Sequence, residues 1–166
     1  MPQITPFLWF DKEAEQAAKF YVSIFKKRSK ILNVSRYGDA GPGPKGSVMV
    51  VELALLGQRV DLLNGGPHFS HSPAFSFVVS CKTQKEIDAY WKKLLAGGGR
   101  PSQCGWLTDK FGLSWQVVPE ALAKLMAKKD AASSQRVMRT MLGMVKFDIA
   151  ALEAAAKGNA ATRAAA

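Results

Sequence analysis

The first part of the chain alternates short apolar stretches with turn signals, in the order strand, helix and three strands. Residues 4–10 are apolar and rich in β-formers. Apolar residues then recur at helical spacing over 14–25, and Asp11 is the expected N-cap of that helix. The three strands that follow are predicted over residues 31–37, 48–55 and 59–63.

The same order of elements restarts after residues 64–67, which read Asn-Gly-Gly-Pro. Thr83, followed by Glu86 three residues later, fits a capping box at the start of a second helix. Gly112 closes a tight turn that favours a positive φ, before a strand in which Leu, Trp and Val alternate with Ser and Gln. Strands in this half are predicted over residues 74–81, 100–107 and 113–118.

Beyond Pro119 the apolar spacing is helical, and helices are predicted over 121–127, 135–142 and 149–157. These helices carry more apolar residues than one small domain leaves exposed, so we expect them to cover a partner subunit or the rim of the first domain. The division we expect is a domain over 1–120, with modules of about 1–66 and 67–120, a helical appendage over 121–158 and a disordered tail over 159–166.

Four segments carry a recognisable pattern: 4–10, 77–91, 104–119 and 136–149. The third of these places two tryptophans, a cysteine and a glutamine within a short stretch. Together the segments resemble the vicinal-oxygen-chelate superfamily of glyoxalase, bleomycin-resistance and dioxygenase proteins. Within it they resemble the PhnB-like group labelled 3-demethylubiquinone-9 3-methyltransferase. The resemblance implies an α+β fold of paired βαβββ modules, here with added C-terminal helices, and we expect a homodimer.

Relatives in this superfamily bind a divalent metal from the first and last strands of each module, and the resemblance places those positions at Ile4, Asp61, about Ser76 and Gln116. Only Asp61 and Gln116 could ligate, whereas a catalytic zinc-type site takes at least three protein ligands. His68 and His71 lie in a Pro/Gly/Ser loop without a helix to align them. We therefore expect neither a metal nor another cofactor, with a metal-dependent glyoxalase or dioxygenase as an alternative.

The methyltransferase label implies a methyl-donor site, which in the common fold is a glycine-rich turn between the first strand and its helix. Here that turn is formed by Asp11, Lys12 and Glu13, without a glycine. The glycine-rich residues 38–46 connect two strands, and the glycines of 97–99 end a helix. The sequence therefore shows no recognisable methyl-donor site that would support the methyltransferase alternative.

The sequence instead favours a small-molecule ligand, because an apolar concavity with a few convergent polar groups is typical of such sites. Since side chains alternate along a strand, Gln116 is expected to face the ligand and Trp115 the core. The candidate ligand-binding residues are Trp9, Tyr37, Asp61, Asn64, Phe77, Cys104, Trp106 and Gln116. The ligand and the chemistry, if the protein is an enzyme, are left open.

The chain carries 23 Lys and Arg against 13 Asp and Glu, a net charge of +10. Because the basic residues are scattered, a solvated basic surface is favoured over nucleic-acid binding, which stays an alternative. No apolar run approaches the ~18 residues of a membrane span, and no leader pattern is seen, so we expect a cytoplasmic protein. Cys81 and Cys104 are expected to be reduced thiols.

Overall fold

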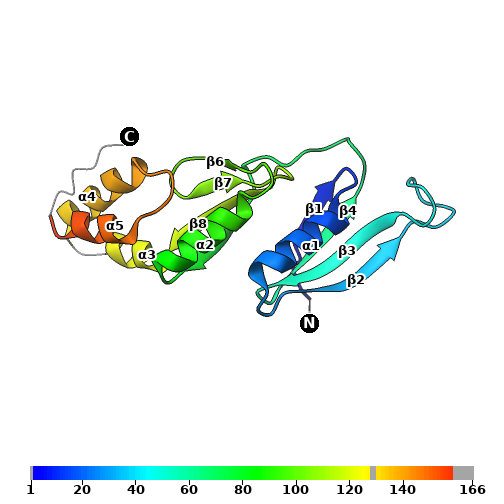
Figure 1. Cartoon of the computed structure of the whole chain (residues 1–166), viewed down its shortest axis with the longest axis horizontal. Helices are drawn as coiled ribbons and strands as arrows, with labels where there is room; N and C mark the ends of the chain where they lie inside the picture. Colours follow the sequence, from blue (N-terminus) through cyan, green and yellow to red (C-terminus); the bar gives the residue numbers. More distant parts are fainter. Residues whose placement is uncertain (1, 128–129, 159–166) are drawn as a thin grey trace. The chain divides into compact units, whose positions relative to one another are not determined.

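The computed structural model describes residues 2–127 and 130–158, so the tail expected over 159–166 lies outside the described residues. The chain divides between His71 and Ser72 into two compact units. The first contains β1 (Phe7–Phe10), α1 (Ala14–Phe25), β2 (Lys30–Arg36), β3 (Val48–Leu55) and β4 (Gln58–Asn64). The second contains β5 (Ser76–Cys81), α2 (Gln84–Leu94), β6 (Arg100–Pro101), β7 (Trp106–Thr108), β8 (Ser114–Pro119), α3 (Glu120–Met126), α4 (Ala131–Leu142) and α5 (Ile149–Ala156) (Figure 1).

Both units are built on the same strand topology. The first sheet has the order β1-β4-β3-β2 and the second the order β5-β8-β7-β6. In each, the first strand pairs in parallel with the last strand of its module, and the other pairings are antiparallel. This arrangement confirms the predicted α+β fold of paired βαβββ modules followed by C-terminal helices.

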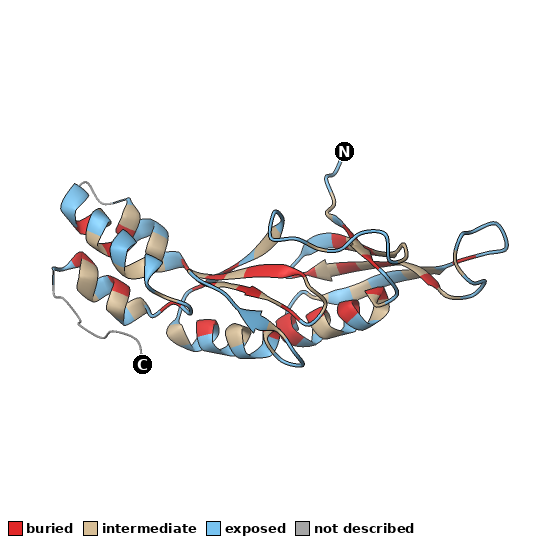
Figure 2. Ribbon diagram, turned by 90° about the horizontal axis from the view of Figure 1, so that it is seen from above, coloured by how far each residue is buried: buried red, intermediate tan, exposed pale blue. Residues whose placement is uncertain are grey.

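In the first unit, α1 covers one face of the sheet and leaves the other face open. Val51, Leu53 and Leu62 are fully buried on the covered face. The helix presents Ala17 and Ala18, both fully buried, and these small side chains let it lie close to the strands. Buried and intermediate positions alternate along the second half of β3, and Figure 2 shows buried positions interspersed along the strands.

The start of α1 differs from the prediction, because Asp11 is not its N-cap. The N-cap is Glu13, whose side chain makes no capping hydrogen bond. Asn64, at the end of β4, accepts a hydrogen bond from the backbone N–H of Ala14 at 2.8 Å and donates one to the Val48 carbonyl oxygen at 3.1 Å. A side chain distant in sequence therefore satisfies the helix terminus and ties it to the sheet.

The predicted capping box of α2 is confirmed. The Thr83 hydroxyl accepts from the Glu86 N–H at 3.2 Å, and the Glu86 carboxylate accepts from the Thr83 N–H at 3.4 Å. Ile87 and Leu94 of α2 are fully buried on the side that packs against the second sheet. The opposite face of that sheet, like its counterpart in the first unit, has no described helix over it.

The single strand predicted over residues 100–107 is interrupted. β6 and β7 are separate because Cys104 (φ +54°) and Gly105 (φ +78°) adopt a left-handed backbone that cannot continue a strand. The turn before β8 agrees with the prediction, since Gly112 has a φ of +84°.

The C-terminal helices pack on one another, and α3 also contacts β8. Ser133 in α4 donates to the carbonyl oxygen of Ala156 in α5 at 2.9 Å. The segment between these helices pairs with the β6–β7 turn, where the Gly105 N–H donates to the Val145 carbonyl oxygen at 2.8 Å. α4 begins earlier than predicted because the Asp130 carboxylate caps it. Among the described residues no helix is long and apolar enough to cross a membrane.

Candidate functional site

The eight candidate residues lie in different environments. Asp61 lies on the open face of the first sheet and Trp9 beside it, while Tyr37 and Asn64 lie at one end of that sheet. In the second unit Trp106 and Gln116 share the open face, Phe77 lies on the face covered by α2, and Cys104 lies in the turn before β7. The candidates therefore form separate groups within each unit.

On the open face of the first sheet, Asp61 belongs to a polar cluster of four side chains. Glu52 lies opposite Asp61 on β3, and the guanidinium of Arg59 contacts both carboxylates, with its Nε 3.5 Å from Asp61. Asn33 on β2 donates to Glu52 at 3.3 Å. Sequence reasoning missed Arg59, although residues two apart on a strand share a face. The cluster members satisfy one another, which favours a structural role.

Of the four residues predicted to stand at ligand positions of a superfamily metal site, Ile4, Asp61, Ser76 and Gln116, only Asp61 carries a charge. Asp61 is held by Arg59 and Gln116 by Ser76, while Ile4 is 96% exposed and precedes β1. In the described part of the chain, no three His, Cys, Asp or Glu side chains come together in a group that could hold a metal ion.

The open face of the second sheet brings a hydrogen-bond donor and an acceptor together. Gln116 pairs across the sheet with Trp106 on β7, and directly opposite residues share a face. Its amide nitrogen donates to the Ser76 hydroxyl at 2.8 Å, which fixes the rotamer. No hydrogen bond is recorded for the Gln116 amide oxygen or the Trp106 indole N–H within the described residues. Val78, paired with Gln116 on its other side and 56% exposed, adds an apolar surface.

Phe77 and Trp115 lie on the other face of the same sheet. They are paired in register, with ring centroids 5.2 Å apart. The Trp115 side chain is 2% exposed and its indole donates to Asp109 at 2.8 Å, so the prediction that Trp115 belongs to the core is confirmed. Phe77 cannot face the same ligand as Gln116.

Neither cysteine has the surroundings of a nucleophile. The Cys104 thiol donates to the Met141 carbonyl oxygen at 3.6 Å, and its N–H donates to the Met144 carbonyl oxygen, so this residue holds the C-terminal segment. Burial, with smaller contributions from Glu86 and Glu120, raises the pKa of the Cys81 thiol to about 11. A raised pKa keeps the thiol protonated and unreactive near neutral pH.

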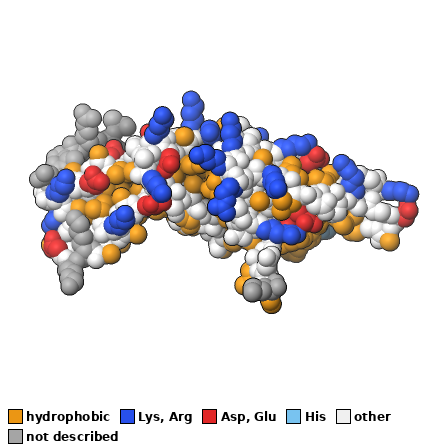
Figure 3. Space-filling model, turned by 90° about the horizontal axis from the view of Figure 1, so that it is seen from below, with side chains coloured by type: hydrophobic (Ala, Val, Ile, Leu, Met, Phe, Trp, Pro, Cys, Tyr) orange, Lys and Arg blue, Asp and Glu red, His pale blue; other side chains and the backbone are white. Residues whose placement is uncertain are grey.

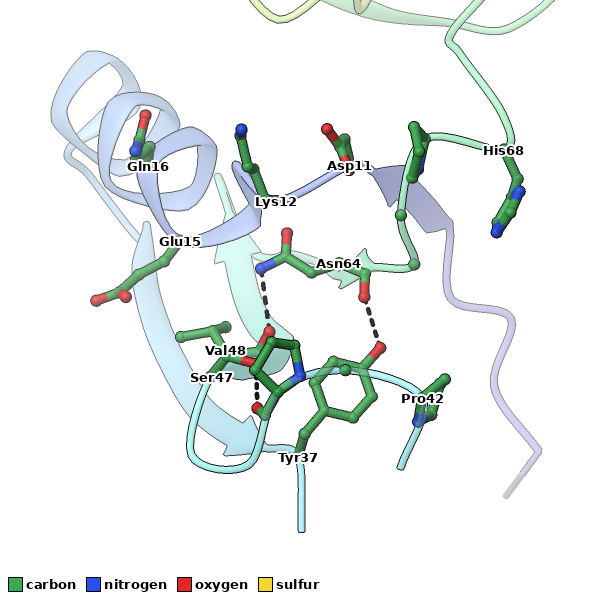
Figure 4. A pocket seen from close by; sticks show the side chains of 15 residues that line it. Asp11, Lys12, Glu15, Gln16, Tyr37, Pro42, Ser47, Val48, Asn64 and His68 are labelled. Carbon is green, nitrogen blue, oxygen red and sulfur yellow. Dashed lines mark hydrogen bonds between the residues drawn. The ribbon is translucent and has the colours of Figure 1, made fainter. Parts of the chain in front are cut away.

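A cavity of about 570 Å³ opens at the end of the first sheet, between the start of α1, residues 37–48 and residues 64–68 (Figure 4). The Tyr37 hydroxyl donates to the Asn64 carbonyl oxygen at 2.6 Å, and the Asn64 amide reaches Val48. Tyr37 and Asn64 therefore belong to this cavity rather than to the open face. Asp11 and His68, which the sequence analysis did not select as ligand-binding residues, also line it.

Basic side chains are spread over the face shown in Figure 3, with acidic side chains among them. Several are paired with carboxylates: Lys19 with Glu15, Lys45 with Asp39, Arg59 with Glu52, Arg136 with Asp130 and Lys146 with Asp88. The Lys146 ammonium and the Gln84 amide lower the pKa of the Asp88 carboxyl. Such a mixed surface gives no particular support to a nucleic-acid interface.

Comparison with known protein families finds a match over residues 2–118 to the family described as 3-demethylubiquinone-9 3-methyltransferase. The match ends near the end of β8, so α3, α4 and α5 lie outside it. A comparison with curated proteins finds no match.

Solved structures with the same fold include a PhnB protein from Bacillus cereus described as a candidate 3-demethylubiquinone-9 3-methyltransferase. It is 37% identical with a TM-score of 0.64, and the match covers 71% of this chain and 99% of that one. A protein from Pseudomonas aeruginosa is 21% identical with a TM-score of 0.59, over 72% and 98% of the two chains. The fosfomycin resistance protein FosX from Mesorhizobium loti is 11% identical with a TM-score of 0.54, over 76% and 98%, and shows similarity of fold alone.

Proposed function

Because the chain belongs to the 3-demethylubiquinone-9 3-methyltransferase family of the vicinal-oxygen-chelate superfamily, we propose that it binds a small oxygen-bearing ring compound without a metal, on the open face of its second sheet. The observation that carries this proposal is the cross-strand pair of Gln116 and Trp106. The pair offers one acceptor and one donor beside the indole ring and Val78. A ring with a hydroxyl or carbonyl group complements such a surface.

The fixed orientation of Gln116 supports a binding role. Its amide nitrogen is already bonded to Ser76, so the amide oxygen is presented without a further loss of side-chain freedom. Asp61 is a weaker candidate, because Arg59 already contacts it. Trp9 is also a weaker candidate, because its indole donates to the Gly66 carbonyl oxygen at 2.8 Å.

Replacing Gln116 by leucine is expected to weaken binding of a ring probe about tenfold or more, since the ligand loses a hydrogen bond. Isothermal titration calorimetry with 2,3-dimethoxy-5-methyl-1,4-benzohydroquinone measures the change. Gln103→Leu is the matched control, because Gln103 is exposed in the turn before β7 and its side chain makes no hydrogen bond to a described residue. Equal affinity in the two variants would argue against the role of Gln116.

The family description also names methyl transfer, which is the alternative activity. The β1–α1 turn consists of two acidic residues and Lys12 and contains no glycine. The Ala14 N–H at the start of α1 already donates a hydrogen bond to the Asn64 side chain. We therefore expect no S-adenosylmethionine binding, whether or not the hydroquinone probe is present, when the intact protein is titrated by calorimetry. Binding of one equivalent per chain would favour the methyltransferase instead.

We also propose that the protein acts as a homodimer. Large apolar side chains are exposed in both units, with Phe7 57% and Leu142 59% exposed. A second copy that covers such side chains would remove them from water, as symmetric oligomers commonly do.

A further inference from the structure

The cavity at the end of the first sheet shares no lining residue with the open face to which we assign the ring compound. It is formed by the start of α1 on one side and by residues 37–48 and 64–68 on the other (Figure 4). The whole cavity lies within the first unit. Its lining therefore provides a second place at which a small molecule could bind.

The walls of this cavity are held by close backbone packing. A Cβ on Gly41 or Gly43 would overlap the ring of Tyr37, and a Cβ on Gly65 would overlap the ring of Trp9. Only glycine lets the backbone lie directly against these rings. Because the Tyr37 hydroxyl is also bonded to Asn64, the wall is formed before any ligand arrives.

The lining combines an apolar wall with a charged rim. The apolar side chains are Tyr37, Pro42, Pro44, Val48 and Pro67. The charged side chains at the rim are those of Asp11, Glu15 and Lys12, two carboxylates and one ammonium group.

The two carboxylates differ in their partners. Glu15 forms an ion pair with Lys19 at 2.6 Å, and Lys19 lowers the pKa of the Glu15 carboxyl. No hydrogen bond or ion pair of the Asp11 carboxylate is recorded in the described part of the chain. Its backbone is nevertheless fixed, because the Asp11 carbonyl oxygen accepts from the Gly66 N–H at 3.2 Å. Asp11 thus presents an exposed carboxylate, on a fixed backbone, at the edge of an apolar cavity.

We propose that this cavity binds a small organic amine, with its apolar body against Tyr37 and the prolines and its ammonium group at Asp11. A protonated amine forms an ion pair with a carboxylate as well as donating hydrogen bonds to it. A neutral alcohol of the same shape can donate a hydrogen bond but forms no ion pair, and an anion is repelled. The prolines and the tyrosine ring supply contact area for the apolar part at little cost in side-chain entropy.

Three probes of similar size test the charge preference at pH 7: benzylamine, benzyl alcohol and benzoate. We expect benzylamine to shift the backbone amide signals of Gly43, Gly65 and His68 in NMR spectra of the intact chain, and to bind about fivefold or more tightly than the other two. Equal affinity for benzyl alcohol, tighter binding of benzoate, or no shift at these amides with millimolar benzylamine would each overturn the proposal.

Two variants test the role of Asp11. Asp11→Asn keeps the size of an exposed side chain and is expected to reduce the benzylamine affinity about fivefold, so that the amine and the alcohol bind alike. Asp39→Asn is the matched control, because Asp39 pairs with Lys45 and does not line the cavity. An unchanged preference for benzylamine in Asp11→Asn, or an equal loss in both variants, would overturn the assignment.

Discussion

Replacing Trp115 by alanine is expected to lower the free energy of unfolding by about 3 to 5 kcal/mol, the usual cost of removing a large buried aromatic side chain. The side chain is 2% exposed and packs against Phe77. Its loss also removes the indole donor from Asp109, a carboxylate that is itself 3% exposed. Urea denaturation followed by circular dichroism measures the change.

Two further substitutions separate the causes of this effect. Trp115→Phe keeps most of the apolar volume but removes the N–H donor. Because the buried Asp109 carboxylate then lacks that hydrogen bond, we expect the free energy of unfolding to fall by about 1 to 3 kcal/mol. Gln116→Leu, on the other face of β8, is expected to change the free energy of unfolding by less than about 1 kcal/mol. A tolerated Trp115→Ala together with an unfolded Gln116→Leu would contradict the register of β8.

The faces of β8 could be predicted from the sequence because they depend on local signals. The turn that ends at Gly112 fixes where the strand begins, and side chains alternate from there. The capping box of Thr83 and Glu86 is equally local, since its partners are three residues apart. Such features need no knowledge of the rest of the fold.

Other parts of the candidate site depend on contacts between residues distant in sequence. Asn64 looked like a ligand-orienting side chain, but it caps α1 at Ala14, 50 residues away. Phe77 pairs in parallel with Trp115, and no short turn fixes the register of a parallel pair. Its face could therefore not be assigned from the alternation of β5 alone.

Cys104 illustrates a different limit of sequence reasoning. A non-glycine residue with a positive φ is uncommon, so the left-handed backbone of Cys104 was not expected and residues 100–107 were predicted as one strand. The conformation follows from the C-terminal segment, whose Met144 and Val145 carbonyl oxygens accept from the N–H groups of Cys104 and Gly105. These contacts make the turn a docking point for the helices beyond the family match.

Substituting Gly105 by alanine is expected to lower the free energy of unfolding by about 2 to 4 kcal/mol and to weaken the packing of the C-terminal helices on this turn. A Cβ at this position would overlap the ring of Phe147 and lie 2.8 Å from the Val117 carbonyl oxygen, while φ is +78°. Gly112→Ala is the matched control, because φ there is +84° but nothing lies within 4 Å of the added atom. It should therefore show only the backbone cost, about 1 to 2 kcal/mol.

A double-mutant cycle of Gly105→Ala with Phe147→Ala separates two costs of the alanine at position 105. One is the overlap of its Cβ with the Phe147 ring, and the other is its left-handed backbone. Phe147 is 2% exposed, so its truncation alone is expected to cost about 3 to 5 kcal/mol. Once the ring is gone, Gly105→Ala should cost about 1 to 2 kcal/mol less than in the intact protein, because the overlap with the ring is removed and the left-handed backbone remains. Strictly additive losses in urea denaturation would mean that the ring of Phe147 contributes nothing to the cost of Gly105→Ala, and would contradict the close approach of Gly105 to Phe147.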